Sequence, residues 1–211
     1  MDKLELFEKL SLEKQAIILD AGFKEFSSKT YTEASTDCIT STCGISKGLL
    51  FYYFGSKRNF YLYCLSKALQ TLTAPSNQPT STNFYDILFN SMDYKIQLCI
   101  TYPLQMKFIN MASRESAKDI LLEKNKLLME YSLNTKKQSK ELLALALSTL
   151  NLKEPDNPYI LDGLNLYVSS VLNKYLMHYQ EKPQDFFNQA ELIKKDLHQY
   201  IDLMLNGILK E

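Results

Sequence analysis

The stretch that decides the fold is Thr42-Cys-Gly-Ile-Ser-Lys-Gly-Leu-Leu-Phe-Tyr-Tyr-Phe-Gly-Ser-Lys57. Its glycines and serines mark where short helices begin and end. Gly44 is free to adopt a positive φ, which predicts a tight turn at residues 43–45. Ser46 is a favourable N-cap and predicts a short helix over about 47–53. Gly55 then ends that helix, and Ser56 caps a longer helix that runs to about Leu72.

The residues before this stretch predict two further helices. Ser11 is a plausible N-cap, and the following residues place Ile18, Ala21 and Phe26 on one helical face. Ser35 caps a short helix over about 36–42. Two short helices joined by a three-residue turn that contains glycine are typical of the helix-turn-helix unit.

The same stretch carries the chemistry expected of a recognition helix, which enters the major groove by its N-terminal end. Lys47 could reach a phosphate or a guanine edge there. Gly48 has no side chain, so the backbone can approach DNA closely. Lys57 begins the next helix, where its ammonium and the free N–H groups of that helix predict a site for one DNA phosphate. Leu50 and Phe54 are expected to face the domain core, and Tyr52 and Tyr53 to lie on the other side.

Composition and charge are compatible with this prediction. The 211 residues are 45% hydrophobic and 23% charged, with only 6 Gly and 6 Pro, which favours long helices over an all-β fold. The net charge is zero, yet residues 38–85 contain four basic residues and no Asp or Glu. A local positive face is therefore possible on a neutral chain. The start of the chain does not resemble a signal peptide, and no apolar run approaches the roughly 20 residues that span a bilayer. We expect a cytoplasmic protein without membrane contact, whose four cysteines are small buried hydrophobic residues with reduced thiols.

Two polar, proline-containing breaks organise the rest of the chain, at residues 74–83 and 151–158. The first separates a domain over residues 1–73 from a second over 84–211. Beyond residue 83 the pattern is helical throughout, with helices expected over about 83–101, 103–113, 116–150, 158–180 and 183–209. The predicted fold class is therefore all-α, with about nine helices: a three-helix N-terminal domain and a helical second domain.

The last two predicted helices are unusually apolar. One carries Leu161, Leu164, Val168, Val171 and Tyr175 at spacings of three and four, and Ile193, Leu197 and Ile201 form a similar seam in the other. Such seams favour helix-on-helix packing, either within one chain or between two subunits. A second stripe that includes Leu166 and Tyr167 widens the first seam, which favours a subunit interface and hence a homodimer.

The residues from Ile18 to Lys57 resemble the N-terminal domain of TetR-type regulators. The resemblance covers roughly residues 12–68 and rests on Ile18-Leu-Asp-Ala, Phe26, Tyr31, Ile39 and the run Gly44-Ile-Ser-Lys-Gly-Leu-Leu-Phe-Tyr-Tyr-Phe-Gly-Ser-Lys57. It implies a three-helix DNA-binding domain, a helical effector domain and dimerisation through the last two helices. The residues then expected to contact DNA are Ser35, Thr36, Ser46, Lys47, Gly48, Leu49, Tyr52, Tyr53 and Lys57.

Three residues depart from the family pattern. Leu49 stands where the family often has Ser or Thr, and Phe51 stands where Tyr is common, so two phosphate-binding hydroxyls are missing. Thr30 replaces the usual Gly before Tyr31. These departures affect the detailed DNA contacts.

The second domain has no comparable motif and is rich in Tyr, Phe and Met. Such a set is either ordinary core or the lining of an apolar pocket. The resemblance favours a sensor for a small hydrophobic ligand, with a pocket expected from Phe89, Met92, Ile96, Phe108, Met111, Leu128, Tyr131 and Tyr167. His178 and His198 lack the clustering of a metal site, so no metal or cofactor is expected.

The sequence leaves two functions open and disfavours a third. The first is a repressor that a small ligand releases from a palindromic double-stranded DNA operator. The second is a DNA-binding regulator whose C-terminal domain binds a protein partner instead. An enzyme is disfavoured, and no catalytic residue is expected, because the chain has no P-loop or GxGxxG motif.

Overall fold

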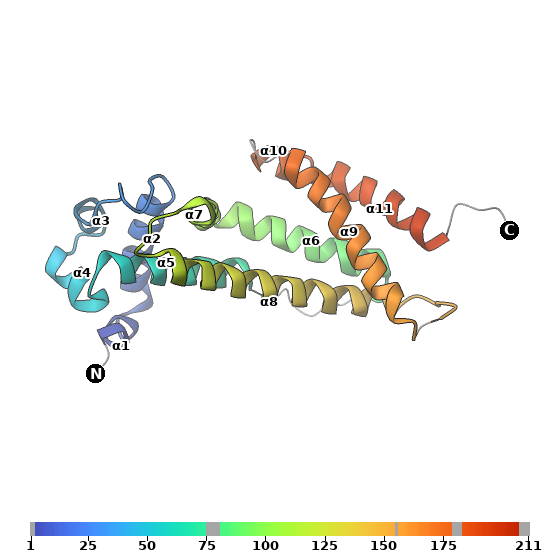
Figure 1. The fold of residues 1–211 in the computed structure, drawn as a ribbon, viewed down its shortest axis with the longest axis horizontal. Coiled ribbons are helices and arrows are strands. Elements are labelled where there is room, and N and C mark those ends of the chain that lie inside the picture. The colour runs from blue at the N-terminus through green and yellow to red at the C-terminus, as the bar shows by residue number, and fades with distance from the viewer. Residues whose placement is uncertain (1–2, 75–80, 155, 179–182, 207–211) are drawn as a thin grey trace. The chain divides into compact units, whose positions relative to one another are not determined.

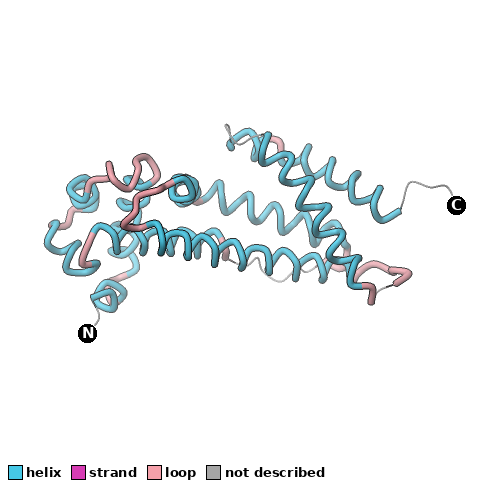
Figure 2. Tube along the Cα trace, viewed as in Figure 1, coloured by secondary structure: helices cyan, strands magenta, loops and turns pink. Residues whose placement is uncertain are grey.

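The structure is a computed structural model that describes residues 3–74, 81–154, 156–178 and 183–206. All regular secondary structure in these ranges is α-helical, in eleven helices (Figure 1). Figure 2 shows no strand in the part of the chain that is described. The prediction of an all-α fold is confirmed, and the predicted number of about nine helices was slightly too low.

The chain divides into two compact units. The first unit comprises residues 1–75 and 97–135, and the second comprises residues 76–96 and 136–211. The helices α6 (Phe84–Thr101) and α8 (Leu121–Leu147) contribute residues to both units.

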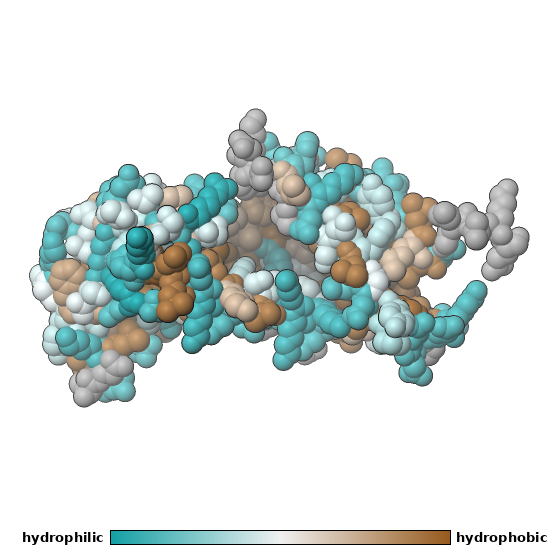
Figure 3. All heavy atoms as spheres, viewed as in Figure 1, coloured by the Kyte–Doolittle hydropathy of each residue, from teal (hydrophilic) through white to brown (hydrophobic). Residues whose placement is uncertain are grey.

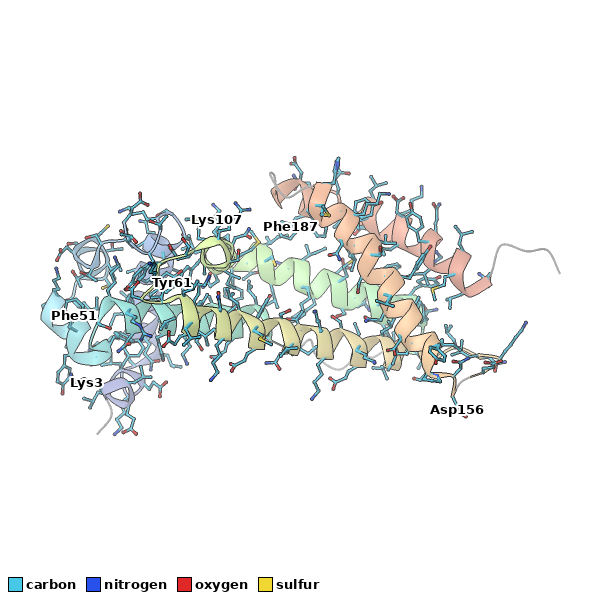
Figure 4. All side chains as sticks on the ribbon, viewed as in Figure 1. Lys3, Phe51, Tyr61, Lys107, Asp156 and Phe187 are labelled. Carbon is cyan, nitrogen blue, oxygen red and sulfur yellow. The ribbon has the colours of Figure 1, made fainter. Side chains whose placement is uncertain are left out.

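The first unit contains α1 (Lys3–Glu8), α2 (Leu12–Phe26), α3 (Thr36–Cys43), α4 (Lys47–Phe54), α5 (Lys57–Leu72) and α7 (Pro103–Arg114). Its core is strongly aromatic. The ring of Phe108 lies 5.5 Å from that of Phe26 and 5.0 Å from that of Tyr61, which is labelled in Figure 4. These contacts pack α7 against α2 and α5.

The capping signals of the sequence set the helix boundaries in this unit. Ser11, Ser35, Ser46 and Ser56 are N-caps, and each side chain accepts a hydrogen bond from a backbone N–H three residues ahead. The predicted helices over 36–42, 47–53 and 57–72 therefore lie within one residue of the observed α3, α4 and α5.

The second unit contains α9 (Pro158–His178), α10 (Pro183–Asn188) and α11 (Ala190–Asn206), together with the residues of α6 and α8 assigned to it. Ile201 of α11 is buried with Phe84 of α6, Leu143 of α8 and Leu164 of α9. A neighbouring cluster joins Val171 and Tyr175 of α9 to Ile193 and Leu197 of α11. Most of the predicted seam residues thus pack inside the chain.

Three predictions about the second half and the cysteines need correction. The helix expected over 183–209 is two helices, because Gln189 forms a turn between α10 and α11; the end of that range lies outside the described residues. The helix expected over 116–150 begins only at Leu121, after a turn at 118–120. Of the four cysteines only Cys64 is buried, whereas Cys38 is exposed and Cys43 and Cys99 are intermediate.

Candidate nucleic-acid interface

The N-terminal half of α4 presents a continuous exposed face. Ser46, Lys47, Gly48 and Leu49 are all exposed, and Tyr52 is exposed one turn further along. On the opposite side of the helix, Leu50 and Phe54 are buried in the core of the first unit, as predicted. A short helix that buries one side and exposes its first turn can offer that turn to a partner surface.

The turn between α3 and α4 has the predicted conformation. Gly44 has a φ of 69°, in the left-handed region that glycine adopts without strain. The backbone N–H of Ile45 donates to the carbonyl of Thr40 at 3.1 Å, and Ser46 Oγ accepts from the N–H of Leu49 at 3.1 Å. The two helices and this turn form a helix-turn-helix.

A buried carboxylate fixes the start of α3. Glu25 Oε1 accepts from the backbone N–H of Ser35 at 2.8 Å and from the ammonium of Lys29 at 2.8 Å. Burial alone would raise the pKa of Glu25, but these hydrogen bonds and one from Cys38 hold it below its usual value. Thr36 follows the cap and is only 8% exposed, so its side chain has little surface to offer DNA.

Lys47 lies on the exposed face with an acidic neighbour. Its Nζ is 2.9 Å from Asp37 Oδ2, and both side chains are largely exposed. Exposed ion pairs contribute little net stability, so this ammonium can exchange the carboxylate for another anion at small cost.

Lys57 is the first residue of α5 and points its ammonium back toward the turn before α3. Its Nζ donates to the carbonyl of Thr32 at 3.2 Å and lies 4.8 Å from the ring centroid of Tyr31. Partial burial lowers the pKa of Lys57, although the nearby carboxylates of Asp119 and other residues oppose this effect. A phosphate beside the ammonium would compensate for its lost hydration.

Residues 38–85 contain no acidic residue, but carboxylates from outside this segment lie next to two of its four basic side chains. Asp37, one residue before it, pairs with Lys47, and Glu123 of α8 lies 2.6 Å from the guanidinium of Arg58. Asp37 lies outside the acid-free residues 38–85, so the sequence pattern gave no sign that it would pair with Lys47. Glu123 lies far from Arg58 in the sequence, and no local pattern indicates that the two side chains pair.

The tyrosines of α4 differ in their surroundings. Tyr52 is exposed, whereas Tyr53 is half-buried with its ring 5.8 Å from that of Phe7. Phe7 belongs to α1, a short helix that the sequence analysis did not predict, and it is fully buried against α4 and α5. The Tyr53 ring therefore also helps to hold α1 in place.

The residues expected to line a ligand pocket fall into both compact units. Phe89, Met92, Ile96 and Tyr167 belong to the second unit, and Phe108, Met111, Leu128 and Tyr131 belong to the first. Phe108 is fully buried in the aromatic core. Phe89 and Met92 pack together on the cluster around Val171, and Leu128 and Tyr131 pack on the core that contains Phe108. Burial raises the pKa of the Tyr131 hydroxyl.

Two further properties concern the described residues only. Their His, Cys, Asp and Glu side chains form no group of three or more that could hold a metal ion. None of their helices has the length and hydropathy needed to cross a bilayer. The face seen in Figure 3 accordingly mixes hydrophilic and hydrophobic side chains.

The helix-turn-helix matches a known family. Residues 18–64 match the model of bacterial regulatory proteins of the tetR family, a range that includes most of α2, all of α3 and α4 and half of α5. No curated protein matches the chain.

Solved structures share the fold over nearly the whole chain. A TetR-like transcriptional regulator from a Rhodococcus species has a TM-score of 0.61 and 15% identity, covering 94% of this chain and 99% of its own. A putative transcriptional regulator from Pseudomonas aeruginosa has a TM-score of 0.57 and 15% identity, covering 97% of each chain. A TetR family transcriptional regulator from Chloroflexus aurantiacus has a TM-score of 0.51 and 19% identity, covering 98% of each chain.

At these identities the solved structures establish the all-helical fold, while the family match lies on the helix-turn-helix itself. The geometry of α3, α4 and the turn at Gly44 agrees with that match. Residues 18–64 of the chain thus carry a helix-turn-helix that matches the tetR family model, within an all-helical fold that resembles solved TetR-family transcriptional regulators.

Proposed function

We propose that the protein is a homodimeric repressor that binds a palindromic operator through α4 and is released by a small hydrophobic ligand. The observation that carries this proposal is the exposed first turn of α4, with Ser46, Lys47 and Gly48 at its tip and Leu50 buried behind. A helix presented in this way suits insertion into the major groove. Tyr52, Tyr53 and Lys57 are proposed to contact phosphates, and Ser35 to orient α3.

A two-fold symmetric dimer would supply the second recognition helix. Operators of this kind place their half-sites about 34 Å apart, one turn of DNA, and a dimer matches that spacing by symmetry. Support comes from α9 and α11, which keep large apolar side chains exposed although their seams pack internally. These exposed residues are Tyr159, Leu166, Met177, Leu192, Leu203 and Met204.

The ligand is proposed to be neutral or weakly anionic and hydrophobic. The candidate pocket residues are Phe, Met, Leu, Ile and Tyr, which offer apolar contacts and a few hydroxyls without buried charge. Methionine is flexible, so Met92 and Met111 could repack around ligands of different shapes.

The DNA-binding part is tested by selecting duplexes from a random-sequence pool with wild-type protein and measuring affinity by fluorescence anisotropy over a salt series. We expect affinity to fall steeply as salt rises. Lys57→Ala should weaken binding to all sequences about equally, because it would remove a phosphate contact. Lys47→Ala should also relax sequence preference. A wild-type protein that selects no duplex would contradict the proposal.

The ligand part is tested with a panel of lipophilic compounds. A ligand that stabilises the protein should raise its melting temperature and lower its affinity for the selected duplex together, because the two effects are linked. A compound that raises the melting temperature but leaves DNA affinity unchanged would show that its site is not a sensor.

A further inference from the structure

The turn between α7 and α8 is built around a single carboxylate. Glu115 Oε1 accepts from the backbone N–H groups of Ser116 and Ala117, each at 2.9 Å. The ammonium of Lys124 donates to the carbonyl of Glu115 at 2.7 Å, and this lysine is only 2% exposed. A buried ammonium is retained only where it is well paired. Both the side chain and the backbone carbonyl of Glu115 therefore stabilise the turn.

The same turn reaches the DNA-binding part of the first unit. The second oxygen of Glu115 accepts from the backbone N–H of Tyr31 at 2.6 Å, across 84 residues of sequence. Burial and the neighbouring carboxylate of Asp119 raise the pKa of the Tyr31 hydroxyl to about 12. Arg58, the second residue of α5, donates from Nε to the carbonyl of Asp119 at 2.6 Å. One turn therefore contacts both the segment before α3 and the start of α5.

Tyr31 connects this turn to Lys57. Its backbone N–H donates to Glu115, and its hydroxyl lies beside the carboxylate of Asp119. Its ring packs edge-on against Tyr61 at 5.2 Å. The Lys57 ammonium lies over the same ring and donates to the neighbouring carbonyl of Thr32. The position of Tyr31 thus sets where the Lys57 ammonium rests.

The carboxylate of Glu115 is ionised at neutral pH. Burial alone would raise its pKa, but the three backbone N–H groups that it accepts from, together with Lys124, hold the pKa below its usual value. Hydrogen bonds to an ionised acceptor are stronger than those between neutral groups. The contact to Tyr31 is therefore a firm constraint on the segment before α3.

We propose that Glu115 and Asp119 are positioning residues for DNA binding, which hold Tyr31 and through it place the Lys57 ammonium for a DNA phosphate. The proposal rests on the proposed function and adds to it a route by which the turn between α7 and α8 controls the phosphate contact. Neither carboxylate is expected to touch DNA.

The test is a double-mutant cycle on the selected duplex. Lys57→Ala should weaken binding and reduce the salt slope by about 1, because one phosphate contact is lost. Glu115→Ala should weaken binding by about tenfold and reduce the slope similarly, since the ammonium would no longer be placed. In the double variant the two losses should not add, because both remove the same contact.

A matched pair of tyrosine variants separates positioning from general stability. Tyr31→Phe keeps the ring and loses only the hydroxyl beside the Asp119 carboxylate, so we expect weaker DNA binding. Tyr63→Phe is the control, because Tyr63 lies on α5, donates its hydroxyl to Glu8 at 3.2 Å and has the ammonium of Lys67 5.1 Å from its ring centroid. Tyr63→Phe should change the melting temperature without changing the salt slope.

Three outcomes would overturn the proposal. The first is additive losses for Glu115→Ala and Lys57→Ala, and the second is an unchanged salt slope for a folded Glu115→Ala protein. The third is a Tyr31→Phe protein that binds DNA no differently from Tyr63→Phe, which decides the matter even if Glu115→Ala fails to fold. A wild-type protein that binds no duplex would instead overturn the proposed function and this inference together.

Discussion

Three glycines in the helix-turn-helix serve different purposes. Gly44 and Gly55 have φ values of 69° and 75°, which L-residues with side chains adopt only at a cost. Gly48 lies inside α4 with an ordinary negative φ, and a Cβ added there would meet only Ser46 Oγ, at 3.9 Å. The first two glycines therefore shape the backbone, whereas Gly48 is not required by the fold.

Gly48→Ala should separate stability from DNA binding. Alanine favours a helix over glycine, so we expect the free energy of unfolding to stay unchanged or to rise by up to about 1 kcal/mol. DNA affinity should fall, because the new methyl group lies between the backbone of α4 and the groove. Thermal unfolding and fluorescence anisotropy measure the two quantities.

Gly44→Ala is the matched control for this substitution. Its Cβ would meet nothing within 4 Å, so only the left-handed backbone is strained, at a cost of about 1–2 kcal/mol. An unchanged DNA affinity in Gly48→Ala would show that the backbone of α4 does not approach DNA closely.

Features that depend on neighbouring residues could be predicted from the sequence, whereas contacts between residues far apart in the chain could not. The serine caps and Gly44 act through neighbours within a few residues, so the sequence was enough to find them. The contact between Glu115 and Tyr31 spans 84 residues, and a single sequence contains no signal for such a pair. Cys38 was misjudged because the short pattern of α3 does not determine which side of that helix faces solvent.

At the scale of elements, the sequence failed where a helix depends on tertiary packing. The six residues of α1 carry no capping signal, and the helix is held because Phe7 packs on the rings of Phe54 and Tyr63. The break between α10 and α11 falls at Gln189, without a glycine or proline to mark it. Strong local signals, such as Pro103 and Pro158 at helix starts, gave boundaries within one or two residues.

The two sides of α9 predict opposite effects for the same substitution. Leu166 is 71% exposed, so Leu166→Glu should leave the fold intact and convert a dimer to a monomer if this side is the subunit interface. Leu164 is fully buried, and Leu164→Glu should unfold the second unit because it buries an unpaired charge. Light scattering and circular dichroism distinguish these results. A Leu166→Glu protein that remains dimeric would exclude this face of α9 from the interface.

At the scale of the whole molecule, the two compact units do not coincide with the domains that the polar breaks in the sequence predicted. The polar break at 74–83 predicted the boundary of a DNA-binding domain, yet residues 97–135 belong to the same compact unit as residues 1–75. The helix α7 packs on α2 and α5 through Phe108, and its apolar pattern alone does not say which partner it has. The division of the chain into DNA-binding and sensing parts stays a prediction.

Acid should destabilise the protein through two carboxylates of the first unit. In the folded protein the pKa values of Glu25 and Glu115 lie below the ordinary value of a glutamate side chain. Groups of this kind stabilise the fold fully above their unfolded pKa, and the contribution is lost as pH falls through the lower folded value. We therefore expect the melting temperature to fall as pH drops below about 4.5.

Glutamine variants identify the source of this acid sensitivity. Glu25→Gln and Glu115→Gln should each lower the melting temperature at neutral pH and flatten its fall in acid. Glu141→Gln is the control, because Glu141 is exposed and pairs with the exposed Lys137 at 3.8 Å. An acid profile that neither Glu25→Gln nor Glu115→Gln alters would assign the sensitivity to other groups.

Because the cysteines differ in burial, their rates of chemical labelling can report how often the core of the first unit opens. Cys38 is exposed, whereas Cys64 is completely buried, with its sulfur against the backbone of Gly22 where α2 crosses α5. Burial also raises the pKa of the Cys64 thiol, so almost none of the reactive thiolate is present. A maleimide should therefore label Cys38 at once and Cys64 only when α2 and α5 separate. The slow labelling rate of Cys64 would give the frequency of that opening in the wild-type protein, without an introduced cysteine.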